Sequence, residues 1–276
     1  MQKIVIQGVQ GAFHEIAARQ FFGCQIEVVP ALSFPELFGI MASSAHADGA
    51  VLAIENSIAG SILGNYALLQ NSQLAIVGEV YLPIRQNLLT LPGATLEDVQ
   101  EVHSHPMALA QCAEFFNRYP HIRLVASEDT AESAAFVARN RSTAIGAIAS
   151  ERAAELYGLQ ILAPAIETVP ENYTRFLALQ RRPEAAPVPA ANKVSLSFTL
   201  ANEPGSLARI LGLMAAENAN LSKIQSVPLL GKPWEYHFYA DFTCLPERIH
   251  ALLQSLSNLA GDLQILGVYR SGSMFN

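Results

Sequence analysis

The sequence predicts an α/β protein with two lobes, followed by a smaller domain at its carboxyl end. Up to about residue 180, short β-rich runs alternate with helical patterns, the order that produces open sheets covered by helices. The alternation comes in two sets of similar size, which favours two lobes with a ligand cleft between them. A stretch with three prolines and no periodicity, QRRPEAAPVPAAN, then separates these sets from the last part of the chain.

Lobe one is predicted over about residues 1–78, with 160–180 added from later in the chain. KIVIQG is a strand that leads through a glycine loop into the helix AFHEIAARQFF, where apolar residues recur at helical spacing. The strand QIEVVPA, the helix SFPELFGIMAS and the strand GAVLAIEN follow. The order βαβαβ is typical of an open sheet.

Lobe two is predicted over about residues 79–159. It begins near YLPIRQNLLTL and continues through alternating strands and helices: VQEVHSH, PMALAQCAEFFNRY, IRLVASED, TAESAAFVARN, TAIGAI and SERAAELY.

A linker at about 181–191 precedes a domain over 192–276 with the order βαββαβ, a ferredoxin-like pattern. Its first strand alternates apolar and polar residues, and a helical face follows it. NLSKIQSVPL and WEYHFYADF flank a Gly-Lys-Pro turn as a hairpin. The helix Pro246–Leu256 and the strand DLQILGVY close the domain.

Composition excludes several classes of protein. No apolar run reaches about 18 residues, and MQKIVIQG lacks the regions of a signal peptide, so we expect a cytoplasmic protein without membrane association. Cys24, Cys112 and Cys244 lie far apart and outside metal-binding spacings, so we expect reduced core residues. A net charge of −7 disfavours nucleic acid, although a pocket with one or two arginines can still bind a small anion.

Two polar segments follow predicted strands in lobe one. The glycine turn 8–11 precedes a helix whose free amides favour an anion, although glycines at such turns are often structural. IENSIAGS ends a strand in a polar cluster that includes Asn56 and Ser57. This cluster has more hydrogen-bonding groups than a helix cap requires, which indicates a pocket wall.

Ser104 and His105 stand at the mouth of a helix that begins at Pro106. His103 and His105 share a strand face, but no third ligand cluster accompanies them, so we predict no metal site.

The segment NYTRF places Thr174 and Arg175 at the start of a strand. A guanidinium can hold a carboxylate in a bidentate manner, and an ordinary surface arginine is the alternative. In a regular strand the two side chains would point to opposite faces, so either the dipeptide sits at a bend or only one of them meets a substrate. The sequence has no P-loop, no series of zinc ligands and no nucleophile triad. We therefore expect a reaction that requires few catalytic groups.

Taken in this order, the segments resemble the prephenate dehydratase family over essentially the whole chain. The resemblance rests on the opening Gly8–Phe13, IENSIAGS, SHPMALAQC, DTAES and TRF. The last domain looks like an ACT domain, with Pro204–Leu207 where the family has Gly-Ala-Leu. The implied fold is a two-lobed catalytic domain of the kind found in periplasmic binding proteins, with a regulatory ACT domain after it.

The resemblance implies conversion of prephenate to phenylpyruvate, without a cofactor. Thr174 is the implied catalytic residue, which assists departure of the ring hydroxyl. Phe13 and Phe176 are implied to flank the ring. The full implied substrate site is Gly11, Ala12, Phe13, Asn56, Ser57, Ser104, His105, Gln111, Thr130, Arg175 and Phe176.

Phenylalanine is the implied inhibitor, bound between paired ACT domains in a dimer or tetramer. The implied effector site comprises Asn202, Pro204, Gly205, Ser206, Leu207, Asn220 and Leu221. Gln225 and Val227 stand where the family has Glu and Arg, so we expect weaker inhibition.

Three further departures from the family concern the pocket: Ala12 replaces Thr or Ser, His14 replaces Ser, and Gln86 replaces His. Two alternatives stay open. One is an arogenate or dual-specificity dehydratase, and the other is a non-catalytic two-lobed regulator that binds an amino acid.

Overall fold

The computed structural model describes residues 1–43, 47–229 and 235–273. Strands and helices alternate through most of this length, which confirms the predicted α/β class. The described helices are all too short or too polar to span a bilayer.

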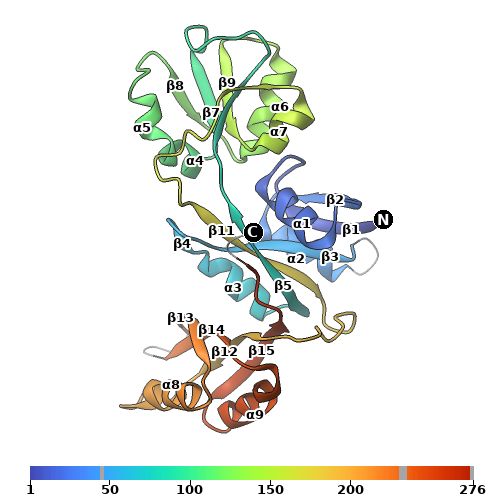
Figure 1. Cartoon of the computed structure of the whole chain (residues 1–276), viewed down its shortest axis with the longest axis vertical. Coiled ribbons are helices and arrows are strands. Elements are labelled where there is room, and N and C mark those ends of the chain that lie inside the picture. Colours follow the sequence, from blue (N-terminus) through green and yellow to red (C-terminus); the bar gives the residue numbers. More distant parts are fainter. Residues whose placement is uncertain (44–46, 230–234, 274–276) are drawn as a thin grey trace. The chain divides into compact units, whose positions relative to one another are not determined.

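The chain divides into two compact units, and the elements of each are seen in Figure 1. Unit 1 comprises Met1–Ile62 and Val80–Phe176, and unit 2 comprises Leu63–Glu79 and Leu177–Asn276. Strands β5 and β11 contribute residues to both units, so the two are linked by continuous strands as well as by loops.

The first sheet of unit 1 is built around a buried parallel pair. Strand β1 pairs in parallel with both β2 and β3, and its central residues Ile4, Val5 and Ile6 are fully buried. Apolar runs without alternation are typical of parallel strands covered on both faces. The elements are β1 (Gln2–Gln7), α1 (Phe13–Phe22), β2 (Ile26–Ala31), α2 (Phe34–Ala42), β3 (Gly49–Asn56), β4 (Gly60–Ser61) and the start of β11 (Tyr173–Arg181).

The second sheet has the strand order β10-β6-β9-β7-β8. Strand β7 pairs in parallel with β8 and β9, whereas β6 pairs antiparallel with β9 and β10. Its strands are β6 (Asn87–Thr90), β7 (Glu101–Ser104), β8 (Arg123–Ala126), β9 (Ile145–Ala149) and β10 (Gln160–Ala163). Strand β10 therefore lies in the second sheet, although the sequence groups it with lobe one.

Short helices with side-chain caps accompany the second sheet. Asp129 caps α6 by accepting hydrogen bonds from two backbone amides, and Ser150 caps α7 by accepting one from the amide of Ala153. The single helix predicted over PMALAQCAEFFNRY is two helices that meet at Cys112. The helices are α4 (Pro106–Gln111), α5 (Ala113–Phe116), α6 (Thr130–Asn140) and α7 (Glu151–Tyr157).

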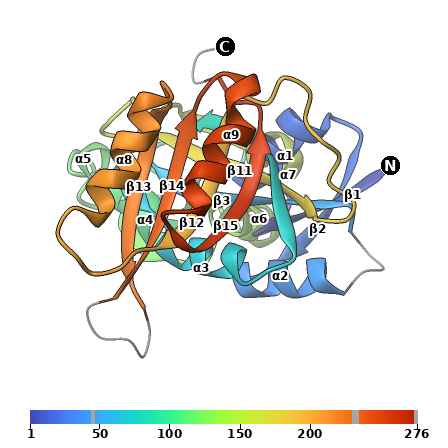
Figure 2. The same cartoon turned by 90° about the horizontal axis from the view of Figure 1, so that it is seen from below.

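Unit 2 contains the predicted βαββαβ domain. Its sheet order is β13-β14-β12-β15, the ferredoxin-like arrangement, and Figure 2 shows α8 and α9 over one face. The elements are α3 (Leu63–Gln70), the start of β5 (Leu74–Pro83), β12 (Lys193–Thr199), α8 (Ser206–Ala216), β13 (Asn220–Pro228), β14 (Tyr236–Thr243), α9 (Pro246–Ser257) and β15 (Gly261–Tyr269). The predicted turn at 231–233 lies outside the described residues.

A buried ion pair links β5 to the first strand of this domain. Lys193 Nζ lies 2.8 and 2.9 Å from the two carboxylate oxygens of Glu79, and both side chains are almost fully buried. The amide of Gly272 also donates to this carboxylate. Removing one partner of such a pair costs about 3–5 kcal/mol, because the other charge stays buried.

The cysteines are all free, but only Cys112 is buried. Cys24 is exposed and Cys244 is only partly buried, so the prediction of core residues is wrong for Cys24 and holds fully only for Cys112.

Candidate functional site

A cavity of about 360 Å³ lies within unit 1 and is lined by elements of both sheets. The first sheet and its helices supply the start of α1, the end of β3 and the first residues of β11. The second supplies the first residues of α4 and α6. Ends of parallel strands and starts of helices thus meet at one place, as the alternating pattern predicts.

Most of the residues that the sequence nominates line this cavity. They come from five separate segments, which the fold brings together. The nominated residues on the cavity wall are Ala12, Phe13, Asn56, His105, Gln111, Thr130, Thr174 and Phe176.

Thr174 is held in a defined orientation by Asn56. Its Oγ1 accepts a hydrogen bond of 3.0 Å from Asn56 Nδ2. Asn56 Oδ1 in turn accepts from the backbone amides of Ile58 and Ala59, at 3.0 and 2.9 Å. Since backbone amides can only donate, they fix which side-chain atom of Asn56 is oxygen. The hydroxyl hydrogen of Thr174 is therefore directed to another acceptor.

A series of hydrogen bonds between side-chain amides extends from Asn56 to the opposite side of the site. Asn172 Oδ1 accepts from Asn56 Nδ2 at 2.7 Å, and Asn172 Nδ2 donates to Gln111 Oε1 at 3.1 Å. Gln86 Nε2 also approaches Gln111 Oε1, at 3.4 Å. With its oxygen engaged twice, Gln111 has its Nε2 hydrogens available for an acceptor in the cavity.

His14 presents a neutral imidazole at the cavity. Burial lowers its pKa from 6.5 to about 3, so the ring is uncharged at neutral pH. Its ring lies 4.9 Å from that of Phe176 and 5.8 Å from that of Phe34. Its Nε2 is buried without a hydrogen-bond partner among the described residues.

Polar groups of the second lobe complete the wall. His105 Nδ1 accepts from the amide of Met107 at the start of α4. Asp129 Oδ1 accepts from the amides of Ala131 and Glu132, and burial raises the pKa of the Asp129 carboxyl.

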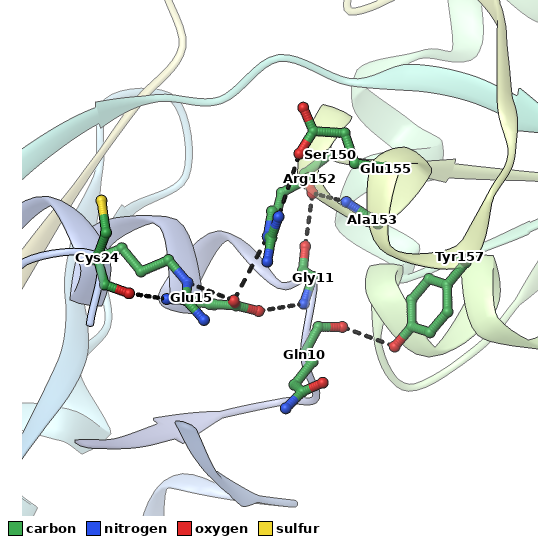
Figure 3. A network of polar contacts seen from close by, with 10 residues as sticks. Gln10, Gly11, Glu15, Cys24, Ser150, Arg152, Ala153, Glu155 and Tyr157 are labelled. Atoms are coloured by element: carbon green, nitrogen blue, oxygen red, sulfur yellow. Dashed lines mark hydrogen bonds and ion pairs between the residues drawn. The ribbon is translucent and has the colours of Figure 1, made fainter. Parts of the chain in front are cut away.

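Gly11 takes part in a network of polar contacts, shown in Figure 3. Its amide donates to Glu15 Oε2 at 2.6 Å, and its carbonyl accepts from Ser150 Oγ at 2.6 Å. Its φ of +92° and the 3.1 Å from an added Cβ to Ala153 leave room only for glycine. Its amide is thus already engaged by a carboxylate.

Ser57, Ser104 and Arg175 do not line the cavity as the structure stands. Ser57 Oγ bonds the backbone of Glu171 and Tyr173, and Ser104 Oγ donates to the carbonyl of Ile148. Arg175 is buried on the strand face opposite Thr174, with its guanidinium 4.0 Å from Glu55. Their assignment to the substrate site stays a prediction.

Several residues on or behind the wall were not nominated. In the sequence, His14 and Gln86 are marked only as departures from the family pattern. Asn172 is marked only by its position close to the TRF segment. Asp129 was detectable as a helix cap before TAES. Phe34 had no signal beyond its place at the start of α2.

The nominated effector residues lie in unit 2, around the start of α8 and of β13. Gly205 takes a φ of +86° at the amino end of α8, and Ser206 Oγ accepts from Arg209. Asn220 begins β13, and Leu221 is partly buried. No cluster of three or more metal-ligating side chains occurs within the ranges that the structure describes.

Comparison with known proteins gives a consistent result. The family model described as prephenate dehydratase matches residues 4–184. The chain is 39% identical over 283 residues to arogenate dehydratase/prephenate dehydratase 1, chloroplastic, of Arabidopsis thaliana, covering 97% of this chain and 71% of that relative.

Two solved structures are similar over nearly the whole chain. Prephenate dehydratase of Arthrobacter aurescens in complex with L-Phe has a TM-score of 0.85 and 28% identity, covering 97% of this chain and 89% of that one. GqqA, described as a novel type of quorum quenching acylase, has a TM-score of 0.87 and 33% identity, covering 98% of each chain.

Proposed function

The chain belongs to the prephenate dehydratase family, and on that premise we propose that it converts prephenate to phenylpyruvate, carbon dioxide and water. The observation that carries the proposal is the Thr174 hydroxyl on the cavity wall, oriented by Asn56 so that its hydrogen is available to a substrate.

The reaction draws its driving force from the substrate. The electron pair of the bond to the ring carboxylate moves into the ring as CO2 departs, the ring C–O bond breaks, and the ring becomes aromatic. Hydroxide leaves as water once it takes up a proton. The protein has to orient the substrate, exclude water and assist departure of the hydroxyl.

Thr174 assists that departure by donating a hydrogen bond to the leaving oxygen. An alcohol of ordinary acidity is a poor full proton donor, so stabilisation of the departing hydroxide is the better role for it. Phe13 and Phe176 flank the ring. The Gln111 amide and the Thr130 hydroxyl, both on the wall, hold a carboxylate.

The direct test is to mix the purified protein with prephenate and detect phenylpyruvate by its ultraviolet absorbance. We expect turnover without an added cofactor. Absence of product from prephenate and from arogenate would refute the dehydratase proposal.

A second candidate, acylase activity, is favoured by the similarity to GqqA. His105 and Asp129 both line the cavity and are groups able to activate a water. Acid release from an N-acylated amino compound, lost in His105→Ala but kept in Thr174→Ala, would support this activity. Loss in both variants, or no release, would argue against it.

We also propose regulation by phenylalanine and self-association through the second unit. The relative from Arthrobacter aurescens was solved with L-Phe. Here the Gly205 turn opens α8 at the end of the sheet where β12 finishes, and β13 starts at the other end. Strand β13 is an edge of its sheet among the described residues, which suits side-by-side pairing of two copies. Light scattering should give the mass of a dimer or tetramer, and a monomer at micromolar concentration would contradict the pairing.

A further inference from the structure

The sheet of the βαββαβ domain is buried on both of its faces. Antiparallel sheets commonly leave a polar face in water, and strand alternation here gives one apolar and one polar face. The apolar face packs against α8 and α9, with Leu196, Phe198 and Phe242 in its core. The polar face is buried as well, and its residues on β12 and β14 are Lys193, Ser195, Ser197, His237, Tyr239 and Asp241.

Helix α3 contacts this polar face, and Figure 1 shows it on the side of the sheet away from α8 and α9. Tyr239 Oη donates to Gln70 Oε1 at 2.5 Å, and Gln264 Nε2 donates to the Gln70 carbonyl at 3.1 Å. The rings of Tyr66 and Tyr239 lie 4.9 Å apart, and the Lys223 ammonium lies 5.5 Å from the Tyr66 ring. Side chains of β13, β14 and β15 thus all contact α3.

Two buried polar atoms of this face have no hydrogen-bond partner among the described residues. They are Ser197 Oγ and His237 Nε2. An unpaired buried polar group costs free energy, so a second arrangement of the face that pairs these atoms can compete with the present one. Because hydrogen bonds depend on direction and packed interfaces are bistable, we expect such a face to change between discrete arrangements.

Helix α3 is joined by a short link to the loop that orients Thr174. Only Ile62 separates β4 from α3. The loop between β3 and β4 carries the two backbone amides that hold Asn56, and Asn56 orients the Thr174 hydroxyl. A shift of α3 therefore acts on the groups that direct this hydroxyl.

We propose that α3 couples binding of phenylalanine to catalysis. Phenylalanine on the βαββαβ domain favours the second arrangement of the polar face, α3 follows the face, and the loop after β3 releases Asn56. The hydrogen bond between Tyr239 and Gln70 belongs to the active arrangement, because it is formed here together with the one between Asn56 and Thr174. This inference rests on the proposed dehydratase function and its inhibition by phenylalanine, and it names the contact that connects them.

The main experiment compares inhibition by phenylalanine in the wild type and Tyr239→Phe. The substitution removes one hydroxyl and keeps the ring against Tyr66. Loss of a hydrogen bond of the active arrangement shifts the equilibrium toward the inhibited one, so the phenylalanine concentration for half inhibition should fall roughly three- to tenfold. By reciprocity, calorimetry should show a lower Kd for phenylalanine. Loss of a merely structural contact gives no reason for tighter binding.

Tyr269→Phe is the matched control. Tyr269 is also a buried tyrosine of this sheet, but its hydroxyl lies 2.7 Å from Ser195 Oγ, between two strands of the sheet. It should leave the concentration for half inhibition unchanged even if it lowers the melting temperature, which is recorded for every variant.

Gln70→Met tests the same hydrogen bond from its other end. It removes the side-chain acceptor of the Tyr239 hydroxyl and keeps the backbone carbonyl that Gln264 binds. It should repeat the effect of Tyr239→Phe, and the double variant should add nothing, because both substitutions delete one interaction.

The route through Asn56 also predicts which kinetic constant phenylalanine changes. A misdirected Thr174 hydroxyl slows the chemical step, so phenylalanine should lower kcat for prephenate and leave KM nearly unchanged. A rise of KM with kcat unchanged overturns the route.

The remaining outcomes separate this inference from the proposed function. An unchanged concentration for half inhibition in Tyr239→Phe overturns the coupling contact, as does an equal shift in Tyr269→Phe. A wild type that converts prephenate but is not inhibited by phenylalanine also overturns it, while the dehydratase function stands. A wild type without dehydratase activity refutes the function itself.

Discussion

Asn56 Nδ2 donates a hydrogen bond to Thr174 Oγ1 across 3.0 Å, and the two residues come from strands far apart in the sequence. The bond occupies a lone pair of the Thr174 oxygen and leaves its hydrogen for another group. The backbone amides of Ile58 and Ala59 set this direction, because they bind the Asn56 oxygen. The polarity of the proposed catalytic hydroxyl is thus determined by the loop after β3.

Thr174→Ala should lower kcat for prephenate roughly 10²-fold or more, the usual loss when assistance to a leaving group is removed. The Michaelis constant should change little, because the bond strengthens only as the hydroxyl departs. Thr174→Ser retains a hydroxyl and is the control, and its activity should lie between those of the wild type and Thr174→Ala. Steady-state kinetics with both variants decides the matter, and near-normal turnover of the alanine variant would remove Thr174 from the mechanism.

Asn172→Ala should lower kcat about tenfold, since loss of one well-placed hydrogen bond costs about 1–1.5 kcal/mol. Asn172 is fully buried and acts through Asn56, so it is a positioning residue. Asn87→Ala is the matched control, because Asn87 is equally polar and buried but bonds only backbone groups away from the cavity. Both variants should lose stability in a thermal melt, but only the first should lose kcat. An equal fall of kcat in Asn172→Ala and Asn87→Ala would show that Asn172 has only a structural role.

Gly11→Ala should destabilise the protein more than Gly23→Ala does. The two glycines have nearly equal φ values, +92° and +90°, in a region that L side chains rarely adopt, so alanine is strained at both. At Gly11 the new Cβ also lies 3.1 Å from Ala153, whereas at Gly23 nothing lies within 4 Å. The difference should be about 1–3 kcal/mol in urea unfolding, the range for overpacking. Equal losses of stability in Gly11→Ala and Gly23→Ala would show that Ala153 moves aside.

His14 should stay neutral across the physiological range and make the protein less stable in acid. Its folded pKa of about 3 lies below the ordinary 6.5, so the unfolded chain binds more protons between these values. Stability is therefore fully present above pH 6.5 and falls as the pH drops, by at most ~1.4 kcal/mol per pH unit from this residue. His14→Ser should show a shallower loss between pH 6.5 and 5.

The comparison of wild type with His14→Ser isolates His14 from Asp129. The pKa of Asp129 is raised on folding, so its contribution has the opposite sign: it is present at low pH and lost as the pH rises. NMR should show a ring signal, absent from the serine variant, that does not titrate between pH 5 and 8. A midpoint near 6.5 for that signal would contradict the buried neutral imidazole.

The fold was largely predictable because its signals are local. Hydrophobic periodicity and caps such as Ser33, Asp129 and Ser150 fix helices and strands within a few residues. The errors arose where tertiary pairing decides. Strand β10 is a short segment whose place depends on pairing with β6, and the predicted helix divides at Cys112 into α4 and α5, which hydrophobic periodicity does not report.

The site was predictable as a set of segments but not as a set of contacts. The family resemblance located Thr174 and Asn56, but only the structure shows that one orients the other. Strand alternation left open whether Thr174 and Arg175 both face the site, and Arg175 was nominated for it, but the structure places Arg175 off the cavity wall. The contact between Gln86 and Gln111 joins the segment between β5 and β6 to the last residue of α4, and no pattern in either segment encodes it. The linker, the residue roles and the effector site stay predictions.

Phenylalanine should bind the whole protein and inhibit it, but at higher concentration than in relatives with the full Glu-Ser-Arg-Pro segment. Gln225 and Val227 replace the charged pair on β13, and both lie on its less exposed face together with Leu221 of the nominated site. An effector shifts an equilibrium only by its difference in affinity for the two states, so loss of a pair that stabilises one state weakens coupling before it weakens binding.

Gln225→Glu with Val227→Arg should therefore lower the phenylalanine concentration for half inhibition about tenfold, for a coupling change of about 1.4 kcal/mol. The single variants Gln225→Glu and Val227→Arg are the controls. Each introduces an unpaired charge, so neither should lower the phenylalanine concentration for half inhibition. Calorimetric titration beside the activity assay separates the two steps: binding without inhibition locates the loss in coupling, and no binding by the whole protein removes the effector site.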